Sequence, residues 1–254
     1  MEGTPVTFNF FKFMVNKSVY LPLIALLLLT PWSASIDQQV SRLFFDQHQF
    51  LSHSFLDGVY HYGLIPAWIT TFIALIIGLA SLIYSPFKQW RKASLLLILT
   101  LALGSGLIIH ALLKDHWGRP RPRQVIEFGG QQPFRAYYQP NFFHQPESSK
   151  SFPCGHCSMG FYFFAVALLG RHYQSKKIYY SGLILAWGLG GLLGFVRIAQ
   201  GGHFLTDVLL SGLIMWLVAL IIYTYLFNGS FKGELNERAF SKATTDAYFY
   251  TRLY

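Results

Sequence analysis

Long apolar stretches separated by short polar segments dominate this chain. The apolar blocks cover about Val19 to Trp32, Leu64 to Tyr84, Ala93 to Leu113, Gly160 to Leu169 with its flanks, Ile178 to Val196 and Val208 to Phe227. A membrane-spanning helix needs about 20 apolar residues, and several blocks reach that length. The fourth block does so only if its helix begins near His156. The pattern predicts an all-α, polytopic membrane bundle of six transmembrane helices over residues 1–227, followed by a tail over residues 228–254.

The first apolar block has two interpretations. Lys12 and Lys17 precede it, and Ser33, Ala34 and Ser35 follow it, as in a cleavable signal peptide. Aromatic residues upstream of the block extend it into the membrane interface, which favours a retained first helix. Cleavage leaves the topology of the other helices unchanged.

Composition supports the membrane assignment. The chain is 53% hydrophobic and only 12% charged, whereas a soluble domain carries about 25% charged residues. The net charge of +9 does not indicate nucleic-acid binding, because the basic residues lie in loops between apolar blocks and no recognisable module holds them. The expected partners are the bilayer and an anionic substrate, and the sequence indicates no oligomeric state.

Charge in the loops orients the predicted bundle. Basic residues gather in two loops, between helices two and three and between helices four and five: Lys88, Arg91, Lys92, Arg171, Lys176 and Lys177. Cytoplasmic loops are enriched in Lys and Arg, so these two loops and both termini should be cytoplasmic. The segment from Lys114 to Phe152 falls on the opposite side although it is also basic. Basic residues in that unexpected place indicate a ligand site.

Two polar clusters lie at the opposite face, next to helices three and four. The first contains Lys114 and the Arg119-Pro120-Arg121-Pro122 run, whose guanidinium groups match phosphate oxygens. The second is Pro153-Cys154-Gly155-His156, where helix-terminal amides and a glycine let an anion approach. His156 is then a candidate proton donor to a leaving oxygen.

A third cluster surrounds the start of the last helix. Arg197 precedes it, and His203 and Asp207 lie four residues apart, on one face of a helix. A carboxylate there fixes the imidazole tautomer and leaves the other ring nitrogen as a nucleophile. A buried His–Asp pair that only ties two helices together is the alternative.

Together these residues resemble the three-part signature of the type 2 phosphatidic acid phosphatase superfamily, which also includes vanadium haloperoxidases. Six residues separate Lys114 from Arg121, five separate Arg197 from His203, and three separate His203 from Asp207, as in that signature. The three motifs occupy residues 114–122, 153–156 and 197–207. Within the superfamily, residues 117–120 and 127–130 resemble bacterial lipid A phosphatases more than undecaprenyl pyrophosphate phosphatases.

The resemblance implies a metal-independent lipid phosphate phosphatase without a cofactor, in a bacterial inner membrane with its site facing the periplasm. His203 attacks phosphorus to form a phosphohistidine, Asp207 orients His203, and His156 protonates the leaving oxygen. The expected phosphate ligands are Lys114, Arg121, Arg197, Gly155 and Cys154. Lipid A is the expected substrate, ahead of undecaprenyl pyrophosphate and the phosphatidyl phosphates.

Cys154 departs from the family pattern, which usually has Ser at this position. A thiol is a weaker donor than a hydroxyl, so a catalytically inactive family member stays an alternative. Cys154 and Cys157 also form a CxxC at a helix start, the arrangement of membrane thiol-disulfide oxidoreductases. That alternative leaves the basic residues, His203 and Asp207 without a role. A disulfide between the two cysteines is a further hypothesis, with distortion of the phosphate loop as its expected effect.

Overall fold

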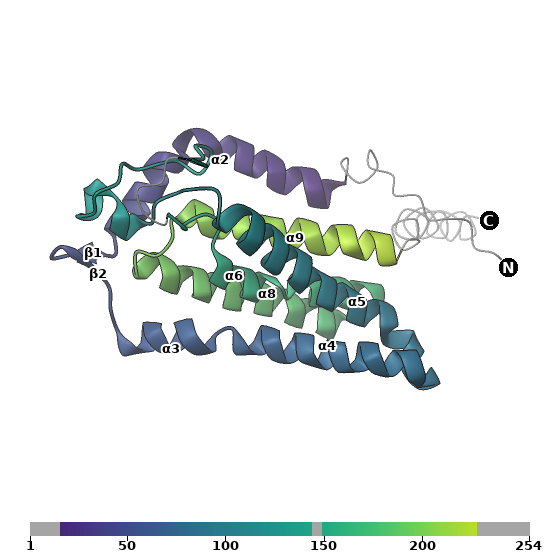
Figure 1. Cartoon of the computed structure of the whole chain (residues 1–254). Helices are drawn as coiled ribbons and strands as arrows, with labels where there is room; N and C mark the ends of the chain where they lie inside the picture. The colour runs from purple at the N-terminus through teal and green to yellow at the C-terminus, as the bar shows by residue number, and fades with distance from the viewer. Residues whose placement is uncertain (1–15, 144–148, 228–254) are drawn as a thin grey trace, which may run out of the picture.

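The computed structural model describes residues 16–143 and 149–227. Its elements, in chain order, are α2 (Lys17–Arg42), β1 (Phe45–Asp46), β2 (Gln49–Phe50), α3 (Ser54–Tyr62), α4 (Ile65–Ile83), η1 (Ser85–Trp90), α5 (Arg91–Leu99), the π-helix η2 (Thr100–Lys114), η3 (Pro122–Gln124), η4 (Ile126–Phe128), α6 (Gly155–Phe161), α7 (Phe164–His172), α8 (Lys176–Ala199) and α9 (Leu205–Leu226). The long helices run side by side along one axis, and the β1–β2 hairpin lies at one end (Figure 1).

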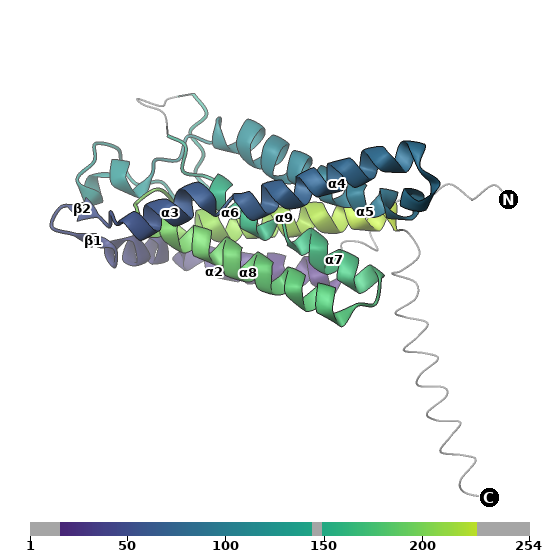
Figure 2. The ribbon, with the colours of Figure 1, turned by 90° about the horizontal axis from the view of Figure 1, so that it is seen from below.

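Five helices in the described ranges are long and apolar enough to cross a membrane. They cover Lys17–Arg42, Ser54–Ile83, Ser85–Lys114, Lys176–Ala199 and Leu205–Leu226. The fourth predicted span folds instead as two short helices, α6 and α7, which pack on α8 and α9 (Figure 2). The structure therefore supports a helical membrane bundle in which five helices are each long and apolar enough to span, and the count of six spans stays a prediction. The predicted cytoplasmic tail, 228–254, lies outside the described residues.

The first helix is longer than the apolar pattern predicted. Asn16 caps α2 by accepting a hydrogen bond from the Ser18 amide at 2.8 Å, and the helix continues past two internal prolines to Arg42. The segment between the first two apolar blocks is therefore largely structured, because it contains the end of α2, the hairpin and α3. Asp37, which lies beyond the first apolar block, is fully buried near the end of α2.

Small residues bring α6 and α7 against α8. A Cβ at Gly160 would collide with the backbone of Gly190, and one at Gly182 would collide with the backbone of Ala167. Glycines of this kind let membrane helices approach backbone to backbone. This close packing fixes the position of the α6 start, which carries His156.

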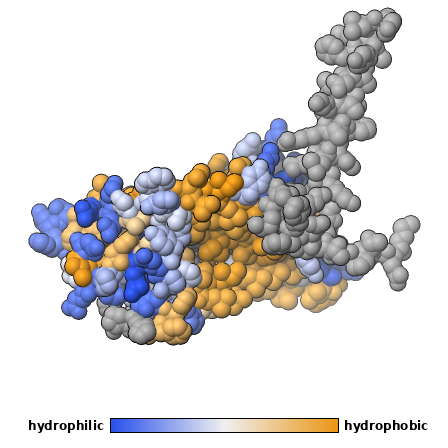
Figure 3. Space-filling model, turned by 90° about the horizontal axis from the view of Figure 1, so that it is seen from above, coloured by the Kyte–Doolittle hydropathy of each residue, from blue (hydrophilic) through white to orange (hydrophobic). Residues whose placement is uncertain are grey.

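The surface divides into two zones. Apolar side chains cover the middle of the molecule, whereas polar side chains cover the end that holds β1, β2 and the loop after η2 (Figure 3). Exposed residues in the apolar zone include Leu27 on α2, Phe72 on α4 and Ile184 on α8. Such a belt suits contact with lipid chains. The polar end is where the signature motifs meet.

Candidate active site

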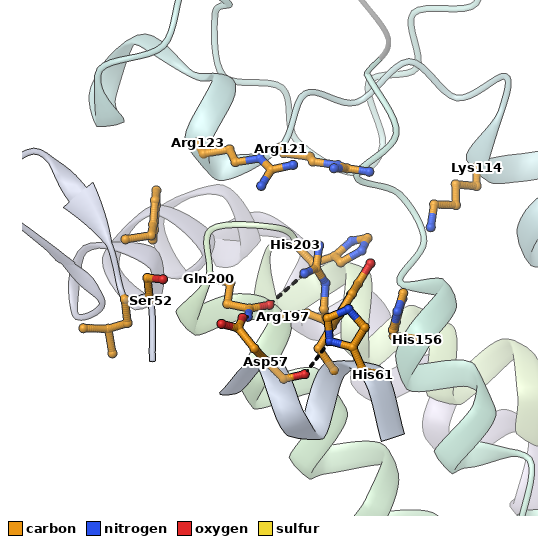
Figure 4. A pocket seen from close by; sticks show the side chains of 13 residues that line it. Ser52, Asp57, His61, Lys114, Arg121, Arg123, His156, Arg197, Gln200 and His203 are labelled. Atoms are coloured by element: carbon orange, nitrogen blue, oxygen red, sulfur yellow. Dashed lines mark hydrogen bonds between the residues drawn. The ribbon is translucent and has the colours of Figure 1, made fainter. Parts of the chain in front are cut away.

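Five predicted site residues line one cavity at the polar end (Figure 4). They are Lys114, Arg121, His156, Arg197 and His203. They come from the end of η2, the loop after it, the first turn of α6, the last turns of α8 and the turn before α9. The cavity has a volume of about 440 Å³. The fold thus unites the three motifs in a space large enough for a phosphorylated head group.

The cavity is strongly cationic. Lys114, Arg121 and a further residue, Arg123, lie on one side and face His156 and the other groups across the space (Figure 4). With Arg197, the lysine and the two arginines make four cations against one carboxylate, Asp57, among the described residues that line the cavity. A cleft with such an excess of positive charge attracts anions. The expected ligand is therefore an anion.

Two of the guanidinium groups retain unused donors. The Nε atoms of Arg121 and Arg197 are buried and have no hydrogen-bond partner within the described part of the chain. Arg197 is only 8% exposed, so water cannot readily satisfy its donor. Charge-assisted hydrogen bonds to phosphate oxygens would satisfy both groups.

Gly155 is required where α6 meets η2. A Cβ at this position would collide with the His110 ring and would lie 3.2 Å from Lys114 Nζ. The glycine therefore leaves room for Lys114 beside the first turn of α6. It does not itself line the cavity.

Cys154 is not placed as a phosphate ligand. It is fully buried, does not line the cavity and is joined to Cys157 by a disulfide bond, so it carries no thiol proton to donate. The hypothesised disulfide is present, and His156 still lines the cavity in its presence. Both sulfur-bearing residues are buried, which leaves a partner thiol no access to them.

The His203 imidazole is held by the backbone. Its Nδ1 donates a hydrogen bond to the carbonyl oxygen of Ser151. A carbonyl only accepts, so the proton resides on Nδ1 and Nε2 keeps a free lone pair in the neutral ring. Burial lowers the pKa of His203 to about 4, against the opposing effect of Asp207, so the ring is neutral near pH 7.

Asp207 acts on His203 less directly than the sequence predicted. Its Oδ2 lies 3.7 Å from His203 Nδ1, beyond hydrogen-bond range. The same oxygen instead accepts from Ser151 Oγ at 2.6 Å and from the Phe204 amide at 2.8 Å. Asp207 thus holds Ser151, and the Ser151 carbonyl orients the imidazole.

A buried ionic layer lies beneath the cavity. Arg119 is fully buried and pairs with Asp207 at 2.5 Å and with Asp37 at 2.7 Å. Asp37 also accepts from the Thr206 amide at 2.9 Å and from its hydroxyl at 2.6 Å. The last turns of α2 and the first turn of α9 are therefore joined through the loop that follows η2.

Sequence reasoning missed several residues of the site. Tyr60, Asp57, Gln200 and Arg123 line the cavity, and Asp37 lies in the ionic layer. Gln200 lies within the third motif and Arg123 directly follows the first, whereas Tyr60 and Asp57 lie in no motif, and Asp37 lies beyond the apolar block that predicted the first helix. In the described ranges, no group of three or more His, Cys, Asp or Glu residues is arranged to hold a metal ion.

Comparisons with known proteins agree with this geometry. The family model of the PAP2 superfamily matches residues 95–230. A lipid A 4'-phosphatase of Francisella tularensis subsp. novicida is 32% identical over 200 residues, which are 76% of this chain and 87% of that protein. A lipid A 4'-phosphatase of Rhizobium leguminosarum is 30% identical over half of each chain.

A lipid A 4'-phosphatase of Rhizobium etli is 29% identical over 50% of this chain and 45% of that protein. No solved structure matches the chain. The family match spans all three motifs that line or support the cavity. The chain therefore belongs to the PAP2 superfamily and is a phosphatase.

Proposed function

We propose that this chain removes a phosphate group from lipid A through a phosphohistidine on His203. The unused Nε donors of Arg121 and Arg197, in the cavity that His203 lines, carry this proposal. They are placed to bind phosphate oxygens while the lone pair of His203 Nε2 attacks phosphorus. The names of the relatives support lipid A as the substrate.

Two steps complete the reaction. In the first, a bond forms between His203 Nε2 and phosphorus, and the bond between phosphorus and the lipid oxygen breaks. His156 gives that oxygen a proton. Burial and the charges of Arg197 and Lys114 lower the pKa of His156 to about 3, so the ring gains this proton only when the bound phosphate offsets those charges. In the second, His156 takes a proton from water, the water oxygen attacks phosphorus, and the nitrogen–phosphorus bond breaks. Inorganic phosphate leaves, and both imidazoles return to their starting states.

We also place the cavity on the periplasmic side of the inner membrane. The connection between α4 and α5 and the connection between α7 and α8 lie at the end of the bundle opposite the β1–β2 hairpin (Figures 1 and 2). They hold basic residues, among them Lys88 in η1 and Lys176 at the start of α8. Enrichment in Lys and Arg favours the cytoplasmic side for that end. The cavity then opens toward the outer leaflet.

The test is phosphate release by purified protein in detergent and EDTA. The substrates are lipid A, undecaprenyl pyrophosphate, phosphatidylglycerophosphate and phosphatidic acid. We expect release from lipid A that EDTA does not inhibit and that falls at least about 10³-fold in His203→Ala. Preference for another lipid would change the substrate, and no release from any lipid would overturn the proposal.

The intermediate is tested with a radiolabelled aryl phosphate, whose leaving group needs no proton. His156→Ala should accumulate labelled protein, because formation of the phosphohistidine proceeds while its hydrolysis is slow. The label should be lost in acid and absent from His203→Ala. Labelling that persists in His203→Ala would exclude His203 as the nucleophile.

A further inference from the structure

One wall of the cavity is built by α3, which lies outside the region matched by the family model. Tyr60 on this helix contacts two of the signature residues. Its ring stacks on the His156 imidazole with a centroid separation of 4.2 Å and an interplanar angle of 16°. The guanidinium carbon of Arg197 lies 4.8 Å from the centre of the Tyr60 ring. A single aromatic ring thus touches the proposed proton donor and a proposed phosphate ligand.

A second contact from α3 reaches Arg197 through Gln200. Asp57 accepts a hydrogen bond from Gln200 Nε2 at 2.9 Å, and Gln200 Oε1 accepts one from Arg197 Nη1 at 2.8 Å. A carboxylate only accepts and a guanidinium only donates, so the amide between them has one allowed orientation. Asp57 therefore orients the Gln200 amide so that its oxygen faces Arg197.

These contacts restrain groups whose placement matters for the reaction. The stack limits rotation of the His156 ring away from its near-parallel orientation to the Tyr60 ring. The cation–π contact and the Gln200 hydrogen bond hold Arg197 from two sides and leave its Nε free. Misplacement of a reacting group by about 1 Å costs a rate factor on the order of 10².

We propose that Tyr60 is a positioning residue for His156 and Arg197, and that Asp57 supports it through Gln200. The proposal rests on the proposed phosphatase function. It makes α3 a part of the active site, although none of the three signature motifs lies on that helix. The aromatic ring, and not the phenol hydroxyl, performs this role, because the ring makes the contacts with both His156 and Arg197.

The first test compares Tyr60→Leu, Tyr60→Phe and the matched control Tyr62→Leu, which changes a 71% exposed residue on the same helix. We expect kcat/KM for lipid A to fall about 30-fold to 100-fold in Tyr60→Leu. Tyr60→Phe and Tyr62→Leu should stay within about twofold of wild type, since both leave the Tyr60 ring in place. A Tyr60→Phe loss as large as that of Tyr60→Leu would overturn the ring as the positioning group.

A change of leaving group separates positioning from a general loss of structure. Phosphoryl transfer from an aryl phosphate needs no proton from His156, so its kcat/KM should fall at least about fivefold less in Tyr60→Leu than kcat/KM for lipid A. Equal losses for both substrates would overturn action through His156. Asp57→Ala should raise KM more than it lowers kcat, because Asp57 acts through Gln200 on Arg197, which is a proposed phosphate ligand.

A final measurement does not depend on turnover. Diethyl pyrocarbonate modifies accessible imidazoles, and mass spectrometry of the peptide that contains His156 gives the rate at this residue. Loss of the stacked ring should raise that rate several-fold in Tyr60→Leu and leave it unchanged in Tyr62→Leu. An unchanged rate in Tyr60→Leu overturns the positioning role, whereas wild-type protein that releases no phosphate overturns only the proposed function.

Discussion

Arg119 and Arg121 lie two positions apart in one Arg-Pro-Arg-Pro run, and the structure uses them in opposite ways. Arg119 is fully buried, and its donors meet Asp37, Asp207, Thr206 and the Arg135 carbonyl. Arg121 lines the cavity, and its buried Nε has no partner in the part of the chain that the structure describes. The hydrogen-bond donors of Arg119 are thus used within the protein, whereas Arg121 keeps a donor for a ligand.

The difference shows what separates a structural cation from a binding cation. A buried ion pair is stable only if both charges and their remaining hydrogen bonds are matched, as they are around Arg119. An unmatched donor is costly in the empty site but gains a partner when an anion binds. Substitution of Arg119 should therefore lower folding stability, whereas substitution of Arg121 should lower activity.

The largest effect should come from Arg119→Gln. The substitution leaves Asp37 and Asp207 buried without a cation, which costs about 3–5 kcal/mol of folding free energy. Thermal unfolding in detergent should show a large drop in Tm, with activity lost in proportion to unfolded protein. The control is Lys150→Gln, since Lys150 pairs with Asp115 at 2.7 Å but is 43% exposed. Its loss should cost less than about 1 kcal/mol. Equal Tm values for the two variants would contradict the ionic layer.

Arg121→Gln should give the converse result. The variant loses a guanidinium that contacts the ligand, so kcat/KM should fall about 10²-fold. Its Tm should stay close to that of wild type, because no buried carboxylate loses its partner. Phosphate-release kinetics and thermal unfolding on the same preparation check both statements. A Tm drop as large as that of Arg119→Gln would place Arg121 in the structural layer instead.

Much of the site was accessible from the sequence. The spacing of the motifs predicted one shared site, and five of the predicted residues line the cavity: Lys114, Arg121, His156, Arg197 and His203. Spacing carries this information because a ligand site requires particular residue types at fixed intervals. It did not distinguish the roles of neighbouring residues in the run. That distinction depends on which donors find partners in three dimensions.

Other features depended on contacts between distant segments. The apolar pattern ended the first helix near Trp32, because a run of polar residues follows it. The helix continues to Arg42 since Asp37 is matched by Arg119 and Thr206, from segments that the local sequence does not reveal. Tyr60 was missed for the same reason, because its proposed role depends on the contact of its ring with His156, which is distant in the sequence.

His203 lies between the buried ionic layer and the cavity and gives the smallest of the expected effects. Its Nδ1 is bound to the Ser151 carbonyl, which the buried Asp207 supports through the Ser151 hydroxyl, and its side chain reaches the cavity. Burial lowers the pKa of His203 from 6.5 to about 4. The unfolded chain therefore binds a proton at this residue between these pH values, and the folded chain does not.

Folding stability should accordingly decrease as the pH falls. The contribution from His203 is a loss of about 1 kcal/mol between about pH 6.5 and about pH 5.5, from the linkage of proton binding to unfolding. His203→Gln keeps a donor for the Ser151 carbonyl and removes the titrating group. The measurement is the difference in unfolding free energy between wild type and His203→Gln across this pH range. A difference that does not change with pH would mean that His203 is not held neutral by burial, although Arg119, Asp37 and Asp207 beneath it are fully buried.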